Sequence, residues 1–163
     1  MTSQKKLILL RHATAEIGLT GIDRDRNLTP HGKAEAVSTG RKLISSPEGW
    51  APDLILASDA TRARQTLEEL KTGLNYEGEV VFQEDFYSCS PDKVLNLSLE
   101  TKDEVGCLLL LGHNPTWSDL IGMLSGQARA LAPANAALLT CDADSWATAL
   151  APAPWSLSGL ITP

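Results

Sequence analysis

Short apolar runs alternate with stretches of helical periodicity along most of the chain. Strand-like runs occur at 6–10, 53–58, 79–82 and 105–112. They are short and bounded by charged or turn residues, which is typical of strands buried in a parallel sheet. The run at 105–112 is almost wholly apolar, so we expect it to be a central strand.

Helical patterns fill the intervals between these runs, at 28–46, 59–74, 90–99 and 114–126. Two of these helices have a clear start signal, because Thr29 and Ser90 can cap a helix and each precedes a proline. Pro115 similarly lies near the start of the fourth helix. We expect the first helix to be buried along a face that carries Ala34, Val37, Leu43 and Ile44.

Regular alternation of strand and helix predicts an α/β fold, a three-layer α/β/α sandwich with a mostly parallel central sheet. Residues 135–142 and 145–151 are interpreted as two closing strands at the edge of this sheet, and the proline-rich stretch 152–163 as irregular. No repeat, linker or block of charge divides the chain, so we expect one domain over residues 1–163.

The chain is acidic, with a net charge of −6 and a pI of about 5.0. A nucleic-acid partner is not expected, because that mode of binding needs a face of clustered lysine and arginine. The three cysteines, Cys89, Cys107 and Cys141, are far apart and form no CxxC pair, so neither a zinc knuckle nor a disulfide framework is indicated. No run has the length of a secretory core or a membrane span, which predicts a cytoplasmic protein without membrane contact.

Candidate chemistry collects after the strands, where ligands bind in open parallel sheets. Arg11 and His12 follow the first strand, Arg62 lies in the first turn of the helix after the second, and His113 follows the fourth. An arginine at a helix start or at the end of a buried strand is unfavourable unless an anion lies beside it. We therefore expect a phosphate site with a neutral histidine as nucleophile toward phosphorus and no required metal.

Three stretches carry a resemblance to a known family: LILLRHATAE, SDATRARQT and LLLLGHNPTWSDL. Together, in this order, they resemble the histidine phosphatase superfamily, also called phosphoglycerate mutase-like, and within it the short SixA-type phosphohistidine phosphatases. The resemblance extends from about residue 5 to 125. It implies a phosphorylated intermediate on His12, a phosphate pocket completed by Arg11, Arg62 and His113, and no cofactor.

The resemblance also indicates positions outside these three stretches. Arg26 matches a basic position expected near the phosphate or the substrate, and Glu84, with Asp85 as the alternative, matches a region that holds the general acid in larger relatives. Ala15 and Gly18 stand where larger mutases carry serine and asparagine, which disfavours mutase activity.

An unclear general acid favours a substrate whose leaving group needs little protonation. Imidazole is such a group, since its conjugate acid has a pKa of about 6.5, whereas an alkoxide needs a proton donor. We therefore expect hydrolysis of phosphohistidine on a partner protein. A phosphatase for small monoesters and a non-catalytic phosphate-binding module remain as alternatives. A metal site formed by His12, His31 and His113 is disfavoured, because no ligand spacing supports it and arginines lie beside the candidate ligands.

Overall fold

The computed structural model describes residues 3–19, 21–151 and 154–163 and contains a six-stranded sheet in the order β3-β2-β4-β1-β5-β6. The strands are β1 (Gln4–Arg11), β2 (Leu54–Ser58), β3 (Glu79–Gln83), β4 (Cys107–Gly112), β5 (Ala136–Asp142) and β6 (Ser156–Ile161). The pairs formed among β1 to β4 are parallel, whereas β5 is antiparallel to β1 and β6 to β5. The expected mostly parallel sheet is confirmed, and β4 is central, with every residue buried.

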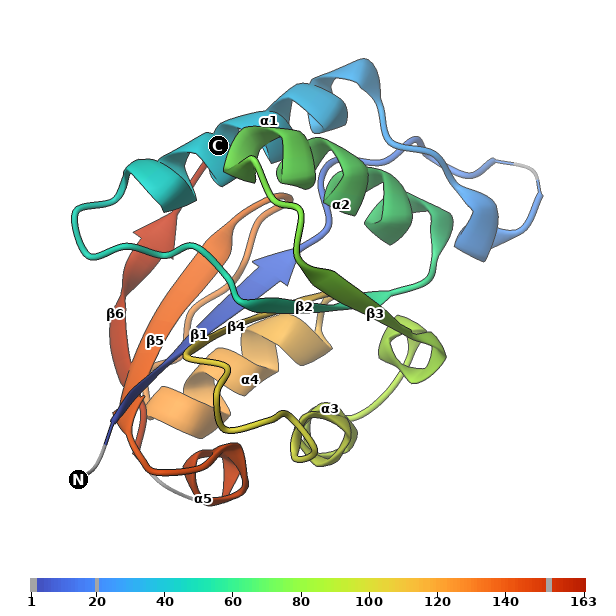
Figure 1. The fold of residues 1–163 in the computed structure, drawn as a ribbon. Helices are drawn as coiled ribbons and strands as arrows, with labels where there is room; N and C mark the ends of the chain where they lie inside the picture. Colours follow the sequence, from blue (N-terminus) through green and yellow to red (C-terminus); the bar gives the residue numbers. More distant parts are fainter. Residues whose placement is uncertain (1–2, 20, 152–153) are drawn as a thin grey trace.

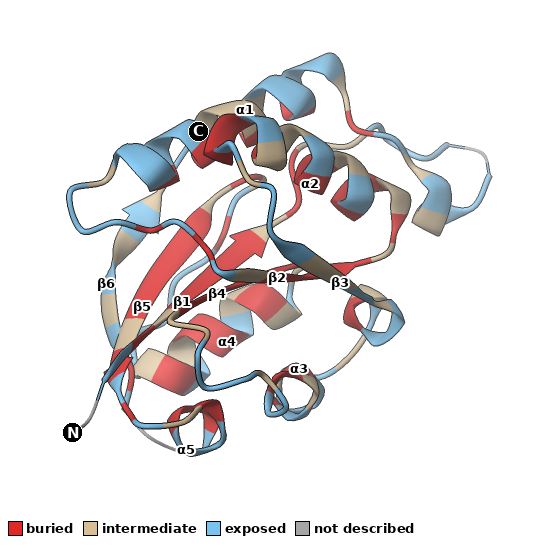
Figure 2. Ribbon diagram, in the orientation of Figure 1, coloured by how far each residue is buried: buried red, intermediate tan, exposed pale blue. Residues whose placement is uncertain are grey.

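Helices cover both faces of the sheet, which confirms the three-layer sandwich (Figure 1). The helices are α1 (Pro30–Ser45), α2 (Thr61–Leu74), α3 (Pro91–Ser98), α4 (Thr116–Ser125) and α5 (Trp146–Leu150), with short 3-10 helices η1 (Asp23–Asp25) and η2 (Glu84–Tyr87). α1 and α2 cover one face and α3, α4 and α5 the other, and each layer has its own buried cluster against the sheet (Figure 2). Thr29 and Ser90 cap α1 and α3 as expected, by accepting hydrogen bonds from backbone N–H groups.

The prediction of which face of α1 is buried was wrong in part. Ala34 and Ile44 are exposed, whereas Leu43 is buried together with small residues of the helix. The reason is a close backbone approach to α2: a Cβ built on Gly40 would lie 2.7 Å from the Leu70 carbonyl oxygen. The helices therefore pack backbone to backbone, which moves the buried stripe toward the small residues.

The end of the chain also differs from the expectation. Residues 145–151 are not a strand: Ser145 caps α5, which buries Trp146, Ala149 and Leu150 with helical spacing. The closing edge strand is instead β6, within the stretch interpreted as irregular, and it pairs with β5 through a register shift near Leu138.

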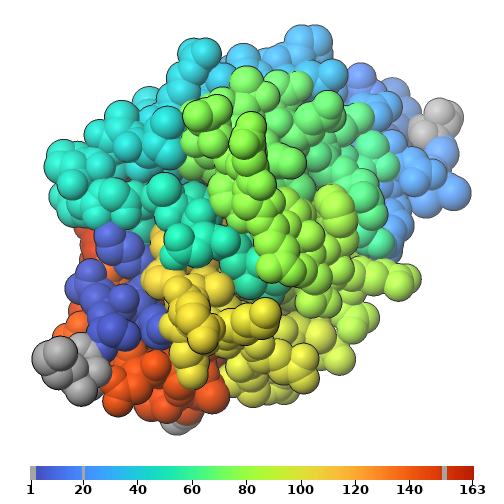
Figure 3. All heavy atoms as spheres, in the orientation of Figure 1, coloured from blue at the N-terminus to red at the C-terminus, as the bar shows by residue number. Residues whose placement is uncertain are grey.

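Side-chain contacts cover the end of the sheet at which the parallel strand β1 begins. The Lys5 side chain donates to the carbonyl oxygen of Asp103 at 2.6 Å, and the Trp146 indole N–H donates to that of Val105 at 2.8 Å. Figure 3 shows the start of β1 in blue beside the yellow loop after α3 and the orange segment around α5. The candidate site lies at the opposite edge. Within the described residues, no helix combines the length and the apolar character that crossing a membrane requires.

Candidate active site

The carboxyl ends of three neighbouring strands meet at one edge of the sheet. Arg11 of β1 is opposite Gly112 of β4, and Ala57 of β2 is opposite Leu111 of β4. The His12 N–H donates to the Gly112 carbonyl oxygen at 3.0 Å, which continues the ladder beyond the strand. Parallel pairing therefore brings together the residues after β1, β2 and β4, as the sequence predicts.

Arg11 is half-buried and oriented by the loop that follows α4. Its Nη1 donates to the Leu131 carbonyl oxygen at 3.1 Å, and Asn114 Nδ2 donates to the same oxygen at 2.8 Å. Arg11 Nε is buried and has no hydrogen-bond partner among the described residues. Burial, and then the charge of Arg62, lower the pKa of Arg11. This cation is thus held in place with one N–H unsatisfied.

His12 has a defined tautomer. Its Nδ1 lies 2.7 Å from the Ala13 carbonyl oxygen, which can only accept, so Nδ1 carries the proton and Nε2 carries the lone pair. Arg62 Nε lies 3.4 Å from that Nε2. Burial is the main cause that lowers the pKa of His12 to about 4, and the charges of Arg62, Arg11 and Arg26 contribute, against the opposing hydrogen bond to Ala13. His12 is therefore a neutral imidazole with a nucleophilic Nε2 at physiological pH.

His113 lies beside His12, with ring centroids 5.1 Å apart. Its Nε2 lies 2.8 Å from Ser58 Oγ, which also accepts a hydrogen bond from the Ala60 N–H. The Ser58 hydroxyl proton has no other acceptor among the described residues, so it bonds to Nε2 and leaves the His113 proton on Nδ1. This Nδ1 is buried and without a partner in the described part of the chain. Burial, followed by the charges of His12 and Arg62, lowers the pKa of His113 to about 3.

A tryptophan behind the site requires the glycine that precedes His113. The Trp117 side chain is fully buried and its N–H donates to the Leu110 carbonyl oxygen at 2.9 Å. A Cβ on Gly112 would lie 2.3 Å from the Trp117 ring. Only glycine fits there, and the close contact holds the backbone that carries His113.

Arg62 is 6% exposed and connects α2 to the loop that carries His12. Thr66, one turn later, donates through its hydroxyl to the Arg62 carbonyl oxygen at 2.7 Å and accepts from the Ala13 N–H at 3.0 Å. Thr66, the second threonine of the TRARQT stretch, therefore joins this stretch to the RHA stretch, a role that was not predicted from the sequence.

Two further side chains, Asp23 and Tyr87, belong to this group and were missed. Arg62 donates from Nη1 to the Asp23 carbonyl oxygen at 3.0 Å and from Nη2 to Asp23 Oδ2 at 3.3 Å. Tyr87 donates its hydroxyl to the same Oδ2, and Arg26 Nε donates to Oδ1 at 2.9 Å. The Tyr87 hydrogen bond, followed by the charges of Arg62 and Arg26, lowers the pKa of Asp23. Arg26 thus reaches the cluster through Asp23.

Tyr87 also packs its ring edge-on against His113, at 5.6 Å between centroids. The guanidinium groups of Arg24 and Arg62 lie 4.8 and 5.6 Å from the centre of the Tyr87 ring. Tyr87 belongs to the QEDFY stretch that also contains the candidate acids, and Asp23 to the DRDR stretch that ends at Arg26.

The two candidate acids after β3 do not join this cluster. Glu84 is exposed and forms no side-chain hydrogen bond or ion pair within residues 3–19, 21–151 and 154–163. Asp85 pairs with Lys93 at 3.6 Å. His31 is exposed and lies 3.7 Å from Glu35. In the described ranges, no group of three or more histidine, cysteine, aspartate or glutamate side chains could hold a metal ion.

A family model described as the histidine phosphatase superfamily, branch 1, matches residues 7–94. This span contains the RHA stretch, the DRDRNLT stretch and the TRARQT stretch. The chain belongs to the histidine phosphatase superfamily.

Its curated relatives in this superfamily include an uncharacterized chloroplastic protein of Arabidopsis thaliana, 37% identical over 172 residues that cover 98% of this chain and 78% of the relative. An uncharacterized Mycobacterium tuberculosis protein is 36% identical over 126 residues, 76% of each chain. Solved structures provisionally named phosphohistidine phosphatase SixA are similar in fold. The one from Nakamurella multipartita has a TM-score of 0.86 at 26% identity and 99% and 97% coverage of this and that chain. The one from Agrobacterium tumefaciens has 0.79 at 28% identity and 98% coverage of both. The phosphoglycerate mutase-like fold of the family is confirmed.

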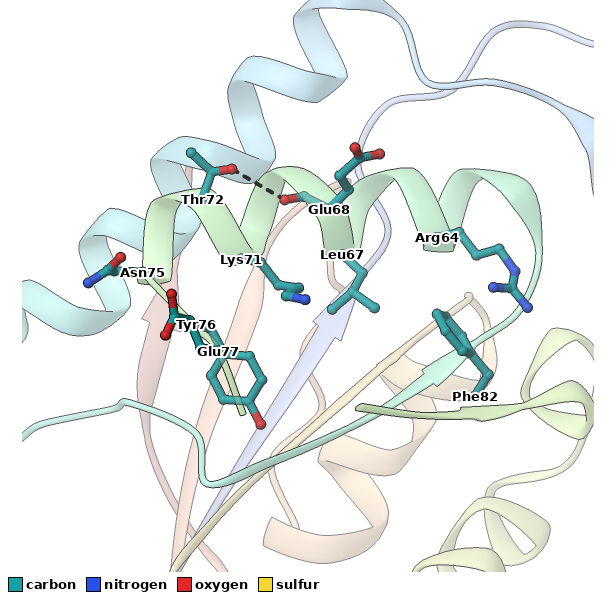
Figure 4. Close-up of a pocket in the computed structure, with 9 residues that line it drawn as sticks. All are labelled: Arg64, Leu67, Glu68, Lys71, Thr72, Asn75, Tyr76, Glu77 and Phe82. Atoms are coloured by element: carbon teal, nitrogen blue, oxygen red, sulfur yellow. Dashed lines mark hydrogen bonds between the residues drawn. The ribbon is translucent and has the colours of Figure 1, made fainter. Parts of the chain in front are cut away.

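A groove elsewhere on this histidine phosphatase is separate from the histidine pair. It has a volume of about 520 Å³ between α2 and β3, and Figure 4 shows the side chains that line it. Arg64 is exposed there and stacks on Phe82 at 3.9 Å. None of the predicted site residues lines this groove, so the chemistry belongs to the strand ends.

Proposed function

We propose that this histidine phosphatase hydrolyses phosphohistidine on a partner protein through a phosphohistidine intermediate on His12. The observation that carries the proposal is the proximity of a neutral, deprotonated His12 Nε2 to two buried N–H groups that have no hydrogen-bond partner among the described residues, Arg11 Nε and His113 Nδ1. A buried donor without an acceptor costs about 1–3 kcal/mol, and a phosphoryl oxygen at each would satisfy it. Arg62 adds a further buried positive charge.

The chemistry takes place in two balanced steps. His12 Nε2 attacks phosphorus, an Nε2–P bond forms, and the P–N bond of the substrate breaks. A substrate imidazole protonated on its other nitrogen leaves as neutral imidazole. Water then attacks phosphorus, the Nε2–P bond breaks, and inorganic phosphate leaves with the oxygen and one proton of that water, while the other proton passes to solvent. Arg11, Arg62 and His113 stabilise the charge on the phosphoryl oxygens in both steps.

The identity of the leaving group agrees with the geometry around Glu84. A monoester needs a proton donor for its alkoxide, whereas Glu84 is exposed and Asp85 is paired with Lys93.

A solved SixA is complexed with tungstate, a tetrahedral oxyanion, and has a TM-score of 0.81 to this chain at 22% identity. The single domain, the cytoplasmic location and the independence from metals and cofactors stay predictions.

The proposal is tested by trapping the intermediate. A protein phosphorylated on histidine with labelled phosphate is mixed with the enzyme and quenched, and the label on the enzyme is analysed. We expect an acid-labile, base-stable phosphoryl group on His12 that is absent in His12→Ala, with turnover reduced by orders of magnitude. His31→Ala is the matched control, because the His31 side chain is exposed and its ion-pair partner is Glu35 rather than a residue of the site; it should label like the wild type.

The same assay separates the alternatives. Equal labelling in His12→Ala would refute the mechanism. Faster turnover of small phosphomonoesters than of the phosphohistidine protein would identify the monoester phosphatase instead. Binding of the phosphoprotein without any turnover would identify a binding module.

A further inference from the structure

The guanidinium of Arg62 contacts both His12 and Asp23, and its Nη1 donates to the Asp23 carbonyl oxygen at 3.0 Å. Nε lies 3.4 Å from the nucleophilic Nε2 of His12, and Nη2 donates to Asp23 Oδ2 at 3.3 Å. An Nε/Nη2 edge is the fork with which arginine binds carboxylate or phosphate side-on. Arg62 therefore contacts both the atom that attacks phosphorus and a carboxylate, and Nη2, one of the two nitrogens of this fork, is already engaged by Asp23.

Asp23 is held there by groups other than Arg62. Its Oδ2 also accepts the Tyr87 hydroxyl proton, and its Oδ1 accepts from Arg26 Nε at 2.9 Å. The Asp23 side chain is 56% exposed, whereas that of Arg62 is 7% exposed. The solvated partner of this pair is therefore the carboxylate, and the cation is the buried partner.

We infer that Asp23 occupies part of the phosphoryl site in the free enzyme and competes with oxyanions for Arg62, so that it selects against ligands that bind through the phosphoryl group alone. The inference rests on the proposed function, because it uses the same phosphoryl pocket. A phosphoryl group bound at His12 Nε2 through the Nε/Nη2 fork of Arg62 competes with Asp23 for Nη2. The carboxylate then has to move away, since two anions at one fork repel each other.

This competition has different consequences for product and substrate. Inorganic phosphate has only its own oxygens with which to offset the displacement of Asp23. A phosphohistidine on a protein also gains contacts outside the pocket. The return of Asp23 to Arg62 therefore favours release of the product and limits inhibition by phosphate.

The test is the affinity for inorganic oxyanions in the absence of turnover. Tungstate and phosphate are titrated by calorimetry into the wild type, Asp23→Asn and Asp23→Ala. We expect both variants to bind tungstate about tenfold more tightly than the wild type, which corresponds to about 1.4 kcal/mol. The inhibition constant for phosphate under turnover should fall in parallel. A structural role for Asp23 would weaken oxyanion binding instead.

Asp25→Asn is the matched control. Asp25 lies on the same 3-10 helix, is exposed and forms no side-chain ion pair or hydrogen bond within the described ranges. The substitution removes the same charge, so affinity close to that of the wild type shows that direct contact matters rather than net charge. Tyr87→Phe removes one support of the carboxylate and should tighten tungstate binding by a smaller factor.

Two results would overturn the inference. Asp23 does not compete for the site if Asp23→Asn and Asp25→Asn shift the affinity equally, or if the Asp23 variants bind tungstate as the wild type does or more weakly. If the wild type itself binds no oxyanion, then the phosphoryl pocket and the proposed function fail first. If tungstate binds but His12 is never labelled, only the covalent mechanism fails.

Discussion

Removal of one oxygen atom, in Ser58→Ala, tests whether the orientation of His113 matters for catalysis. Ser58 is fully buried at the end of β2, and its Oγ lies 2.8 Å from His113 Nε2 and 3.2 Å from the Ala60 N, which donates to it. In the wild type the hydroxyl proton holds the tautomer with the His113 proton on Nδ1. Without the hydroxyl, Nε2 can carry the proton instead, and Nδ1 then presents a lone pair to the phosphoryl oxygens.

The expected magnitudes follow from these two contacts. A buried polar group that loses its partner costs about 1–3 kcal/mol. With the His113 and Ala60 nitrogens both affected, we expect a loss of about 2 kcal/mol, or about 4–8 °C in Tm for a chain of this size. Loss of one preorganised donor to a developing oxyanion reduces kcat by about 10²–10³-fold. Part of the His113 population in Ser58→Ala should still carry its proton on Nδ1, so we expect a reduction of kcat at the lower end of that range.

The assay combines thermal unfolding with hydrolysis of a histidine-phosphorylated protein. Ser98→Ala is the matched control, because Ser98 is a fully buried serine on α3 whose Oγ donates to the Val94 carbonyl oxygen at 2.8 Å. It should lose about 1 kcal/mol of stability with unchanged kcat. Ser58→Ala that loses stability but keeps the wild-type kcat would refute the argument that Ser58 sets the tautomer of His113.

Two further predictions concern packing and pH. Gly73→Ala should destabilise the fold by about 1–3 kcal/mol in urea unfolding, because its Cβ would lie 2.2 Å from the Val37 carbonyl oxygen. The control Gly122→Ala, whose Cβ meets nothing closer than 3.7 Å, should be neutral or stabilising by up to about 1 kcal/mol. Equal effects of the two substitutions would contradict the close approach of α1 and α2. The pKa values of His12 and His113, lowered to about 4 and about 3, mean that the unfolded chain binds more protons between those values and about 6.5. Stability should therefore fall as the pH decreases through this window, and NMR titration of both imidazoles should show them neutral at pH 5.5; titration near pH 6.5 would contradict their burial.

The elements with strong local signals could be predicted from the sequence. The helix starts at Thr29-Pro30 and Ser90-Pro91 follow from capping chemistry that involves only adjacent residues. The short helix α5 and the edge strand β6 could not be predicted in the same way. Five residues around Trp146 fit a turn of helix or a strand equally well, and an edge strand acquires its structure from its partner β5.

The residues of the site also divide into those that the strand pattern predicts and those that it does not. Arg11, His12 and His113 belong to the first group, and Asp23 and Tyr87 to the second. The first three directly follow or end buried strands, and a parallel sheet aligns its carboxyl ends, so the strand pattern alone predicts that they meet. Asp23 and Tyr87 lie on short 3-10 helices 64 positions apart in the chain. Nothing local brings these two together, and their hydrogen bond exists only because both segments fold over the buried Arg62.

The sequence by itself thus determined the layered α/β fold, the edge of the sheet where the candidate site lies and the cationic, histidine-containing character of that edge. These properties follow from hydrophobic periodicity and from the direction of parallel strands, which short segments encode. The tertiary structure alone decided the protonated nitrogen of each histidine and the carboxylate beside Arg62. These depend on contacts such as Ser58 with His113, between residues 55 positions apart, and a hydrogen bond at that separation is set by the packing of the whole fold.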